Sequence, residues 1–229
     1  MPNRPFVFIN VAASADGKID TFERRGAAIS SPVDKARVDR LRSEADAVMV
    51  GGRTLLDEDP KLTVKSAELR AARAARGLSE NPIKVGVVTR AELKPESEFL
   101  NAGPARIVIF TTAQTARAQI EALRSRKVEV FMLGEQRVDL VSALDRLTGL
   151  GVERLMVEGG ATLNFELLRL GLVDELNVYV APLIFGGQAA PTLAAGPGLT
   201  RSSAIPMRLV AAEVLDEDGG VLLHYILST

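Results

Sequence analysis

Short apolar runs alternate with amphipathic segments along most of the chain. Nearly continuous apolar runs at 6–13, 48–50 and 155–157 are typical of strands that are buried on both faces. Further strands are predicted at 84–89, 106–111 and 128–132, with helical segments at 113–126 and 140–147. Strands that alternate with helices favour an α/β fold with a mostly parallel central sheet flanked by helices.

The last third of the chain has a different pattern. A strand is predicted at 174–181, followed by a loop rich in Gly, Pro and Ala at 186–199. Two apolar segments at 209–215 and 221–227 flank an Asp-Glu-Asp-Gly-Gly turn, which predicts an antiparallel hairpin at the end of the sheet. No repeat or linker divides the chain, so a single domain over residues 1–229 is expected.

Ser31 and Pro32 mark the start of a helix that is predicted to run to about residue 45. The Ser31 hydroxyl can accept a hydrogen bond from the N–H of Asp34, and Pro32 takes the first helical position, where its missing N–H costs nothing. Spacings of three and four define the stripe expected to be buried, which consists of Val38, Leu41 and Ala45. The charged residues around the stripe are expected to face solvent, namely Asp34, Lys35, Arg37, Asp39 and Glu44.

The strand at 155–157 is followed by Glu158, Gly159 and Gly160, and then by a helical segment at 162–170. Two glycines allow another molecule to approach the backbone, and the free N–H groups of the helix start attract an anion such as a pyrophosphate. Two glycines alone are also compatible with a plain tight turn. Glu158 favours the ligand-binding interpretation, because open α/β sheets bind ligands at the carboxyl ends of their strands.

A second glycine-rich turn follows the strand at 48–50, with Gly51 and Gly52 before Thr54. Three consecutive carboxylates at 57–59 then precede Pro60, which discourages a helix, so this charge run is interpreted as a solvated turn. The Asp16-Gly17 pair after the first strand is compatible with an ordinary turn or with a loop that faces a ligand.

Composition narrows the possible chemistry. The chain has 28 Lys and Arg against 29 Asp and Glu, so no strong basic field attracts nucleic acid or an anionic membrane. There is no Cys and only one His, His224, so disulfides, thiolate zinc sites and Cys nucleophiles are excluded, and no metal site is expected. The first apolar run is broken by Asn10 and resembles neither a signal peptide nor a membrane span, so a cytoplasmic location is expected.

Five motifs, taken in order, resemble the riboflavin-biosynthesis pyrimidine reductase family over almost the entire chain. They are the segments 13–19, 46–51 with Thr54, 59–64, 157–160 with Leu163 and Asn164, and 171–176 with Ala181 and Pro182. The resemblance implies a dihydrofolate-reductase-like fold, a homodimer, and reduction by NADPH of the ribosyl group of a ribosylaminopyrimidine 5′-phosphate to a ribityl chain. Leu176, Val178 and Val180 alternate along the predicted strand at 174–181, which also favours a partner at the sheet edge.

The resemblance also implies two sets of binding residues. The residues implied for the cofactor NADPH are Ala12, Thr54, Glu58, Thr89, Gly159, Gly160, Ala161, Thr162, Leu163 and Asn164. The residues implied for the substrate are Asp16, Ser30, Arg42, Leu62, Lys65 and Glu158. Glu58 and Glu158 are the candidates for the catalytic carboxyl that supplies or relays a proton.

The chain departs from the family pattern at two places. Glu58 stands where the family usually has Asp, and Val88-Thr89-Arg90 stands where many members have Asp-Ser. Arg90 and the pair Thr111-Thr112 are cationic and hydroxyl groups of the kind that a 2′-phosphate needs, so NADPH is expected to bind in preference to NADH.

Many family members carry an additional deaminase domain whose zinc site needs His or Cys ligands. The chain has no Cys and therefore lacks the Cys pair of that site, so a stand-alone reductase is expected. Two alternatives remain open: an NADPH-dependent reductase of the same fold that acts on another substrate, such as a dihydrofolate-like pterin, and a protein that binds NADPH without catalysis.

Overall fold

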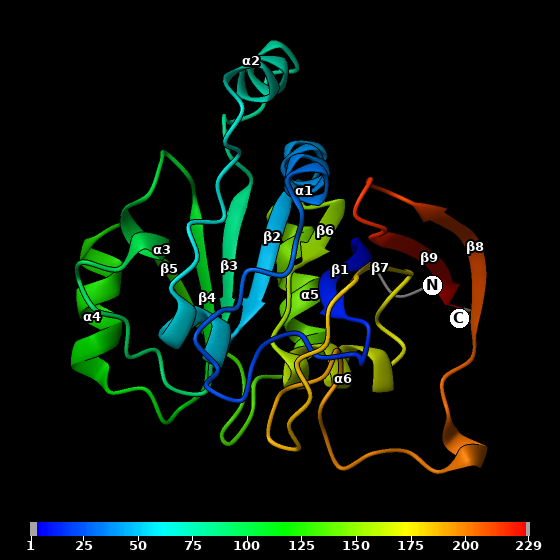
Figure 1. Ribbon diagram of the computed structural model, residues 1–229. Helices are drawn as coiled ribbons and strands as arrows, with labels where there is room; N and C mark the ends of the chain where they lie inside the picture. The colour runs from blue at the N-terminus through cyan, green and yellow to red at the C-terminus, as the bar shows by residue number, and fades with distance from the viewer. Residues whose placement is uncertain (1–3, 228–229) are drawn as a thin grey trace. The chain divides into compact units, whose positions relative to one another are not determined.

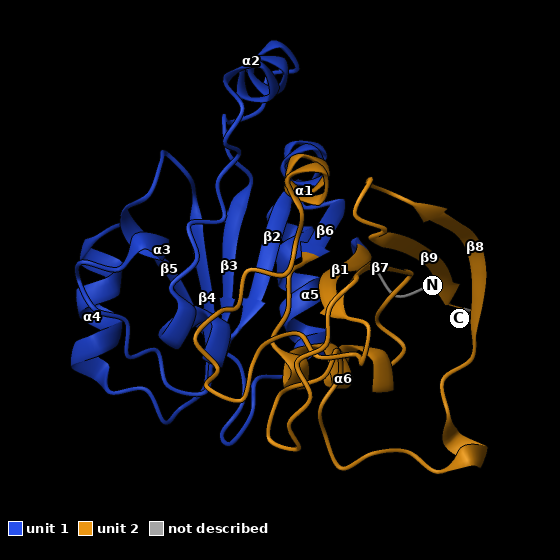
Figure 2. Cartoon of the chain, viewed as in Figure 1, with its two compact units in different colours: residues 1–6, 39–156 blue, residues 7–38, 157–229 orange. Residues whose placement is uncertain are grey.

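The computed structural model describes residues 4–227, which form two compact units (Figure 2). Unit 1 contains residues 39–156 and the chain up to Phe6, and unit 2 contains residues 7–38 and 157 onward. Each unit combines strands with helices, and each is described by itself below. The expectation of a single domain stays a prediction.

Unit 1 has strands in the order β5-β4-β3-β2-β6 (Figure 1). Its elements are β2 (Ala47–Gly51), η1 (Thr54–Glu58), α2 (Ala67–Ala75), β3 (Ile83–Val87), α3 (Glu98–Asn101), β4 (Ile107–Thr111), α4 (Arg117–Ser125), β5 (Glu129–Met132), α5 (Leu140–Gly149) and β6 (Arg154–Val157). The pairs β2–β3, β3–β4 and β4–β5 are parallel. Every residue of β2 is buried, as the continuous apolar run predicted.

Unit 2 has strands in the order β1-β7-β9-β8. Its elements are β1 (Phe6–Ser14), which starts at the last residue of the first segment of unit 1, α6 (Ala161–Arg169), β7 (Glu175–Ala181), η2 (Arg201–Ser203), β8 (Met207–Val214) and β9 (Val221–Leu227). β1 pairs with β7 in parallel, whereas β7–β9 and β8–β9 are antiparallel. The predicted α/β fold with a mostly parallel sheet and an antiparallel C-terminal hairpin is therefore confirmed.

The parallel registers bring the loops of each unit to a common edge. In unit 1, Gly51 is opposite Val87, and Val87 is opposite Phe110, so the turns after β2, β3 and β4 are neighbours. In unit 2, Ser14 is opposite Ala181, so the loop after β1 adjoins the loop after β7. Both units thus present loops at carboxyl strand ends, where α/β sheets bind ligands.

Helix α1 (Pro32–Glu44) begins where the sequence predicted, and the N–H of Asp34 donates to the Ser31 hydroxyl at 3.2 Å. The prediction that Asp34 and Asp39 face solvent is wrong, because both are buried. Asp34 pairs with Arg37 at 2.8 Å, and Asp39 accepts the backbone N–H groups of Lys65 and Ser66 at 2.6 and 2.8 Å. Both oxygens of Asp39 are therefore hydrogen-bonded, whereas Asp34 is paired through Oδ1 and its buried Oδ2 has no hydrogen-bond partner.

The charge run at 57–59 is not a simple turn. Residues Thr54–Glu58 form one turn of π-helix, η1, which ends before Pro60 as that proline requires. Glu58 and Asp57 are exposed, in line with the predicted solvation, but Asp59 is half-buried and has a left-handed backbone conformation, with φ 48°. A single π-helical turn often lies at a functional site.

Candidate active site

The turn between β6 and α6 in unit 2 has the geometry of an anion site. Gly159 and Gly160 have φ values of 111° and 78°, which other residues rarely adopt. A Cβ added at Gly159 would meet no atom within 4 Å, so this glycine is required by the backbone conformation and faces open space. Gly160 is the N-cap of α6 and provides no side-chain cap, so the first N–H groups of α6 lack the usual side-chain acceptor.

Asn164, in α6 just after this turn, connects the helix to the loop that follows β7. Its side chain is fully buried, and its amide Nδ2 donates to the carbonyl of Leu193 at 2.9 Å. The N–H of Ala195 donates to the carbonyl of Ala161 at 2.9 Å. The side chain of Asn164, predicted to contact the cofactor, thus attaches the loop after β7 to α6 instead of pointing into open space.

The loop after β1 is held to the loop after β7 by Asp16. The Ser14 hydroxyl donates to the Asp16 carboxylate at 2.6 Å, and the N–H groups of Phe185 and Gly186 donate to it at 3.2 and 2.8 Å. The Ser14 hydroxyl, together with these N–H groups, holds the pKa of Asp16 below its ordinary value despite the opposing effect of burial. The negatively charged Asp16 therefore connects the two loops through hydrogen bonds. Its direct contact with substrate stays a prediction.

Ala12 and Ser30 lie close to a small apolar cluster of unit 2. Ala12 packs against the cluster of Ile29, Tyr179 and Ala181, and half-buried Ser30 follows Ile29 in the chain. The Tyr179 hydroxyl donates to the Asp216 carboxylate at 2.8 Å, which joins β7 to the turn between β8 and β9. The cluster thus fixes the backbone on which both predicted residues lie.

In unit 1, η1 carries the predicted cofactor residues Thr54 and Glu58. Thr54 is half-buried and Glu58 is exposed. Gly52 precedes η1 and lies against Val88, since a Cβ at Gly52 would be 3.1 Å from Val88 Cγ2. Leu55 packs on Gly86 of β3, where an added Cβ would come within 2.7 Å of Leu55 Cδ2. The glycines at 52 and 86 allow η1 to approach β3 closely.

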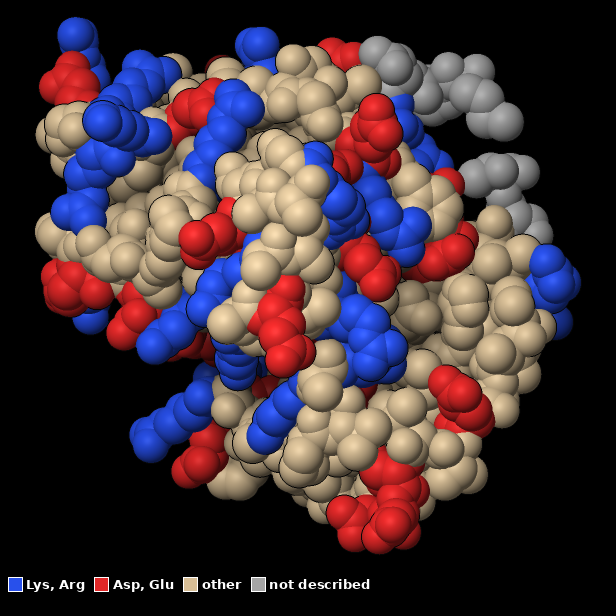
Figure 3. All heavy atoms as spheres, turned by 90° about the horizontal axis from the view of Figure 1, so that it is seen from above, with Lys and Arg blue, Asp and Glu red and all other residues tan. Residues whose placement is uncertain are grey.

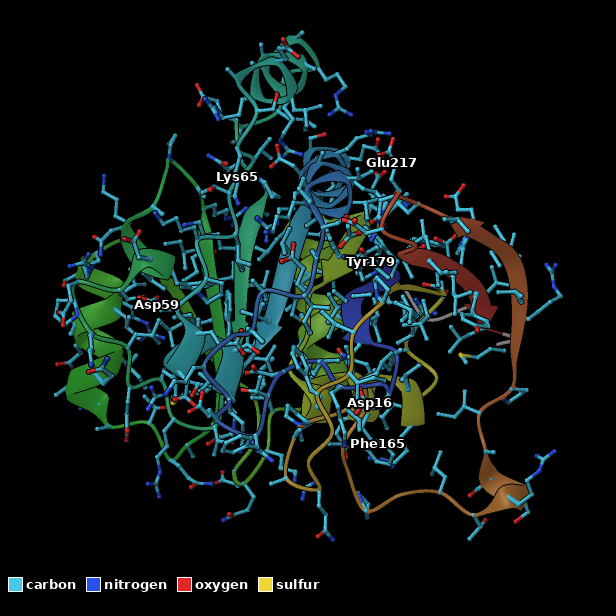
Figure 4. All side chains as sticks on the ribbon, in the orientation of Figure 1. Asp16, Asp59, Lys65, Phe165, Tyr179 and Glu217 are labelled. Carbon is cyan, nitrogen blue, oxygen red and sulfur yellow. The ribbon has the colours of Figure 1, made fainter. Side chains whose placement is uncertain are left out.

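The structure brings together the predicted substrate residues Arg42, Leu62 and Lys65. The Arg42 guanidinium donates to the carbonyl of Thr63 at 3.2 Å. The N–H of Lys65 donates to the carboxylate of Asp39, which lies about one turn before Arg42 in α1. The Lys65 side chain is exposed, beside the segment that leads to α2 (Figure 4). Leu62 has φ 49° and is 1% exposed, so its contact with substrate stays a prediction.

The residues expected to bind the 2′-phosphate differ in exposure. Thr89 and Arg90 are exposed. Thr111 and Thr112 are fully buried, and both hydroxyls donate to the carbonyl of Thr89, at 3.2 and 2.8 Å. The two buried hydroxyls therefore shape the Thr89 turn, which leaves Thr89 and Arg90 as the groups available to a phosphate.

Sequence reasoning missed Asp20 and Asp59. Buried Asp20 accepts the N–H groups of Thr21, Gly26 and Ala27 and so orders the loop that leads to Ser30. Such a carboxylate followed by a Gly-containing loop is a local signal that could have been used. Asp59 binds residues 38 to 40 positions away, and no local pattern could have found it.

Two features are absent from the described residues, 4–227. No group of three or more His, Cys, Asp or Glu side chains is arranged to hold a metal ion. Within the same range, no helix has both the length and the apolar character needed to cross a membrane.

Comparison with known proteins identifies the family. Residues 5–221 match the family described as the RibD C-terminal domain. The chain belongs to the RibD C-terminal domain family.

Two archaeal relatives extend this result, and both are named 2,5-diamino-6-ribosylamino-4(3H)-pyrimidinone 5′-phosphate reductase. The protein of Archaeoglobus fulgidus is 42% identical over 202 residues, which cover 88% of this chain and 91% of the relative. The protein of Methanothermobacter thermautotrophicus is 43% identical over 216 residues, which cover 94% and 95%. The predicted family and the predicted class, a reductase, are confirmed.

The RibD C-terminal domain fold is also found by structural comparison. RibD of Acinetobacter baumannii matches with a TM-score of 0.80 at 22% identity, over 99% of this chain and 59% of that one. This likeness confirms the predicted dihydrofolate-reductase-like fold. A reductase of this family takes its hydride from a nicotinamide cofactor.

Proposed function

We propose that the protein reduces the ribosyl group of a ribosylaminopyrimidine 5′-phosphate to a ribityl chain with NADPH, as a step of riboflavin biosynthesis. The observation that carries the proposal is the match to two reductases over about nine-tenths of both chains. Both relatives are named for the 2,5-diamino pyrimidinone, which favours the aminated substrate over the deaminated one.

The cofactor pyrophosphate is assigned to the start of α6. A Cβ added at Gly159 would meet no atom within 4 Å, and the N–H groups of Ala161, Thr162 and Leu163, which no side chain caps, supply donors. The nicotinamide and its ribose are assigned to Ala12, Thr54 and Glu58, as the family resemblance implies. Exposed Thr89 and Arg90 are assigned to the 2′-phosphate, so we expect NADPH to bind more tightly than NADH. Equal affinities in a fluorescence titration would contradict this assignment.

The substrate phosphate is assigned to Arg42 and Lys65. Arg42 presents part of its guanidinium near the 62–65 segment, and Lys65 presents an exposed ammonium from that segment. Cations of this kind bind a phosphate dianion through charge-assisted hydrogen bonds. A pterin carries no such phosphate, so these two residues favour the phosphorylated pyrimidine over a dihydrofolate-like substrate.

The chemistry requires little from the protein beyond positioning. When bound, NADPH supplies the hydride that adds to C1′ of the open-chain imine. Opening of the ribosyl ring requires a proton at the ring oxygen, and the carboxyl of Glu58 or Glu158 is the candidate that supplies or relays it. The remaining residues hold the reacting carbons in contact and exclude water.

A homodimer is part of the proposal. Every residue of β8 is exposed, although the strand is mostly apolar. Met207, Leu209 and Val210 are 45–49% exposed, and Val214 is 72% exposed. An exposed apolar edge strand is normally covered by another chain. Light scattering should therefore give about twice the mass of one chain, 24.5 kDa, and a mass of one chain at working concentration would contradict the dimer.

Small molecules are the proposed partners, because the surface does not favour a polyanion. The formal net charge is −1, and Figure 3 shows a face on which Lys and Arg are interspersed with Asp and Glu. Steering of nucleic acid requires a large field of one sign.

The direct test mixes purified protein and NADPH with the aminated or the deaminated ribosylaminopyrimidine phosphate and follows absorbance of the reduced nicotinamide. We expect oxidation of NADPH with the aminated compound, and a lower kcat/KM with the deaminated one. If neither compound is reduced, the proposal fails, and a dihydropterin tested in parallel shows whether another substrate accounts for the site.

A further inference from the structure

One face of β3 supports η1 at two points. Side chains alternate between the two faces of a strand, so positions 84, 86 and 88 share a face. Gly86 lies against Leu55, the second residue of η1, and Val88 lies against Gly52, two residues before η1. Both contacts hold the start of η1, and its end at Glu58 lies three residues further along the chain.

Lys84 is the third residue on this face, and it holds α3 instead. Its side chain is 1% exposed, and Nζ donates to the carbonyls of Phe99 at 3.0 Å and Ala102 at 2.5 Å. The ammonium also lies 5.9 Å from the centre of the Phe99 ring. Lys84 thus attaches the last turn of α3 to the same strand that supports η1.

Asp59 links the end of η1 to the start of α3 (Figure 4). It follows Glu58 directly, and its left-handed backbone turns the chain out of η1. One carboxylate oxygen accepts the Ser97 hydroxyl and the N–H of Phe99 at 3.0 Å, and the other accepts the N–H of Glu98 at 2.8 Å. Burial raises the pKa of Asp59, but these three donors bring it below the ordinary value. The carboxylate is therefore an anion fully engaged with α3.

We infer that Asp59 is a positioning residue of the reductase: through α3, which Lys84 fastens to β3, it fixes the end of η1 and hence the place of Glu58. The inference rests on the proposed function, in which η1 contacts the nicotinamide. Asp59 acts through its neighbours, since its carboxylate is used by Ser97, Glu98 and Phe99 and needs no contact with a ligand.

The test compares Asp59→Ala, Ser97→Ala and the double variant with the parent. Ser125→Ala is the matched control, because Ser125 also donates its hydroxyl within unit 1, to the carbonyl of Ala122 in α4, without touching α3. Each protein is measured for the NADPH dissociation constant, for kcat and KM with the pyrimidine phosphate, and for the melting temperature without ligand.

Asp59→Ala should raise the NADPH dissociation constant about tenfold or more and lower kcat, whereas KM for the pyrimidine phosphate should change little. Ser97→Ala removes one charge-assisted hydrogen bond and should have the same effect to a smaller extent. The double variant should be no worse than Asp59→Ala, because both changes break one connection. Asp59→Asn keeps acceptance from Ser97 and tolerates the left-handed conformation, so it should recover part of the affinity.

Two results would overturn the inference. In the first, the variants melt earlier than the parent but keep its NADPH affinity and kcat, which would make the connection a scaffold only. In the second, Asp59→Ala weakens NADPH binding while Ser97→Ala matches Ser125→Ala, which would mean that Asp59 contacts the ligand itself. Failure of the proposed function appears separately, as a parent protein that binds NADPH but reduces neither pyrimidine. The dissociation constants would then still decide whether Asp59 positions η1.

Discussion

The two glycine-rich turns look alike in sequence and differ in structure. After β6, Gly159 and Gly160 adopt positive φ, and a Cβ at Gly159 would meet nothing. After β2, Gly52 has no positive φ, and its Cβ would lie against Val88. The first turn needs glycine because of backbone conformation, whereas the second needs it because another strand is close. A turn with an open Gly is suited to receive a ligand, and a turn with a packed Gly is suited to hold a helix in place.

The two carboxylates beside these turns should differ most in function. Glu58 ends η1, and Glu158 directly precedes Gly159. We expect Gln at the residue that relays the proton to lower kcat by about 10²–10⁴-fold, and Gln at the other to change kcat by less than about tenfold. Steady-state NADPH oxidation by Glu58→Gln and Glu158→Gln measures this. If both variants keep the kcat of the parent, neither carboxyl transfers the proton.

The buried ammonium of Lys84 in β3 should make the unfolding free energy of the protein depend on pH. Burial lowers the pKa of Lys84 from 10.5 to about 8, although the carboxylates of Glu98 and Asp59 favour the charged form. Below about pH 8 the folded protein bears the cost of a buried charge, and this cost is relieved as pH rises from 8 to 10.5, because the unfolded chain then binds more protons.

Lys84→Met removes this titration and keeps the side-chain volume similar. The unfolding free energy of the parent should therefore rise relative to that of Lys84→Met by up to about 3 kcal/mol between pH 8 and 10.5. Urea unfolding at several pH values measures the difference. A difference that stays constant with pH would show that Lys84 titrates at its ordinary pKa.

Alanine at the two glycines should separate the two kinds of turn. Gly159→Ala places a side chain at φ 111° and should lower the unfolding free energy by about 1–3 kcal/mol. In Gly52→Ala the added Cβ lies 3.1 Å from a Val88 methyl and 3.5 Å from its next neighbours, so its smaller cost should disappear in a Val88→Ala background. The Val88→Ala change should leave the cost of Gly159→Ala unaltered. If Val88→Ala reduced the cost of Gly159→Ala as much as that of Gly52→Ala, the distinction between the two glycine turns would be contradicted.

The sequence predicted those helices and strands that are determined by neighbouring residues in the chain. Continuous apolar runs located β1, β2 and β6, and Ser31 with Pro32 located the start of α1. Asp39 and Lys84 were not predicted to be buried, because the groups that compensate their charge come from other segments, such as the N–H of Lys65 and the carbonyl of Ala102.

The candidate site was predictable to a similar extent. The positive φ of Gly159 and Gly160 could be anticipated from their own sequence, whereas two glycines alone did not distinguish a ligand site from a plain tight turn. The contacts of Thr111, Thr112 and Asn164 could not be predicted from the sequence. A Thr or Asn that binds a ligand and one that holds a neighbouring loop are the same residue in the sequence. Only the acceptors, Thr89 and Leu193, distinguish them.

The assignment of the cofactor pyrophosphate to the start of α6 can be tested at Thr162, which is exposed in the first turn of that helix. Thr162→Glu adds a negative charge, and Thr162→Gln is its neutral match. A carboxylate at this position favours the helix, so Thr162→Glu should melt at the same temperature as Thr162→Gln or higher without ligand. Because the same charge repels a pyrophosphate, Thr162→Glu should bind NADPH about tenfold more weakly than Thr162→Gln at low salt, with a smaller ratio at high salt. Equal NADPH dissociation constants for the two variants at low salt would show that the pyrophosphate binds elsewhere.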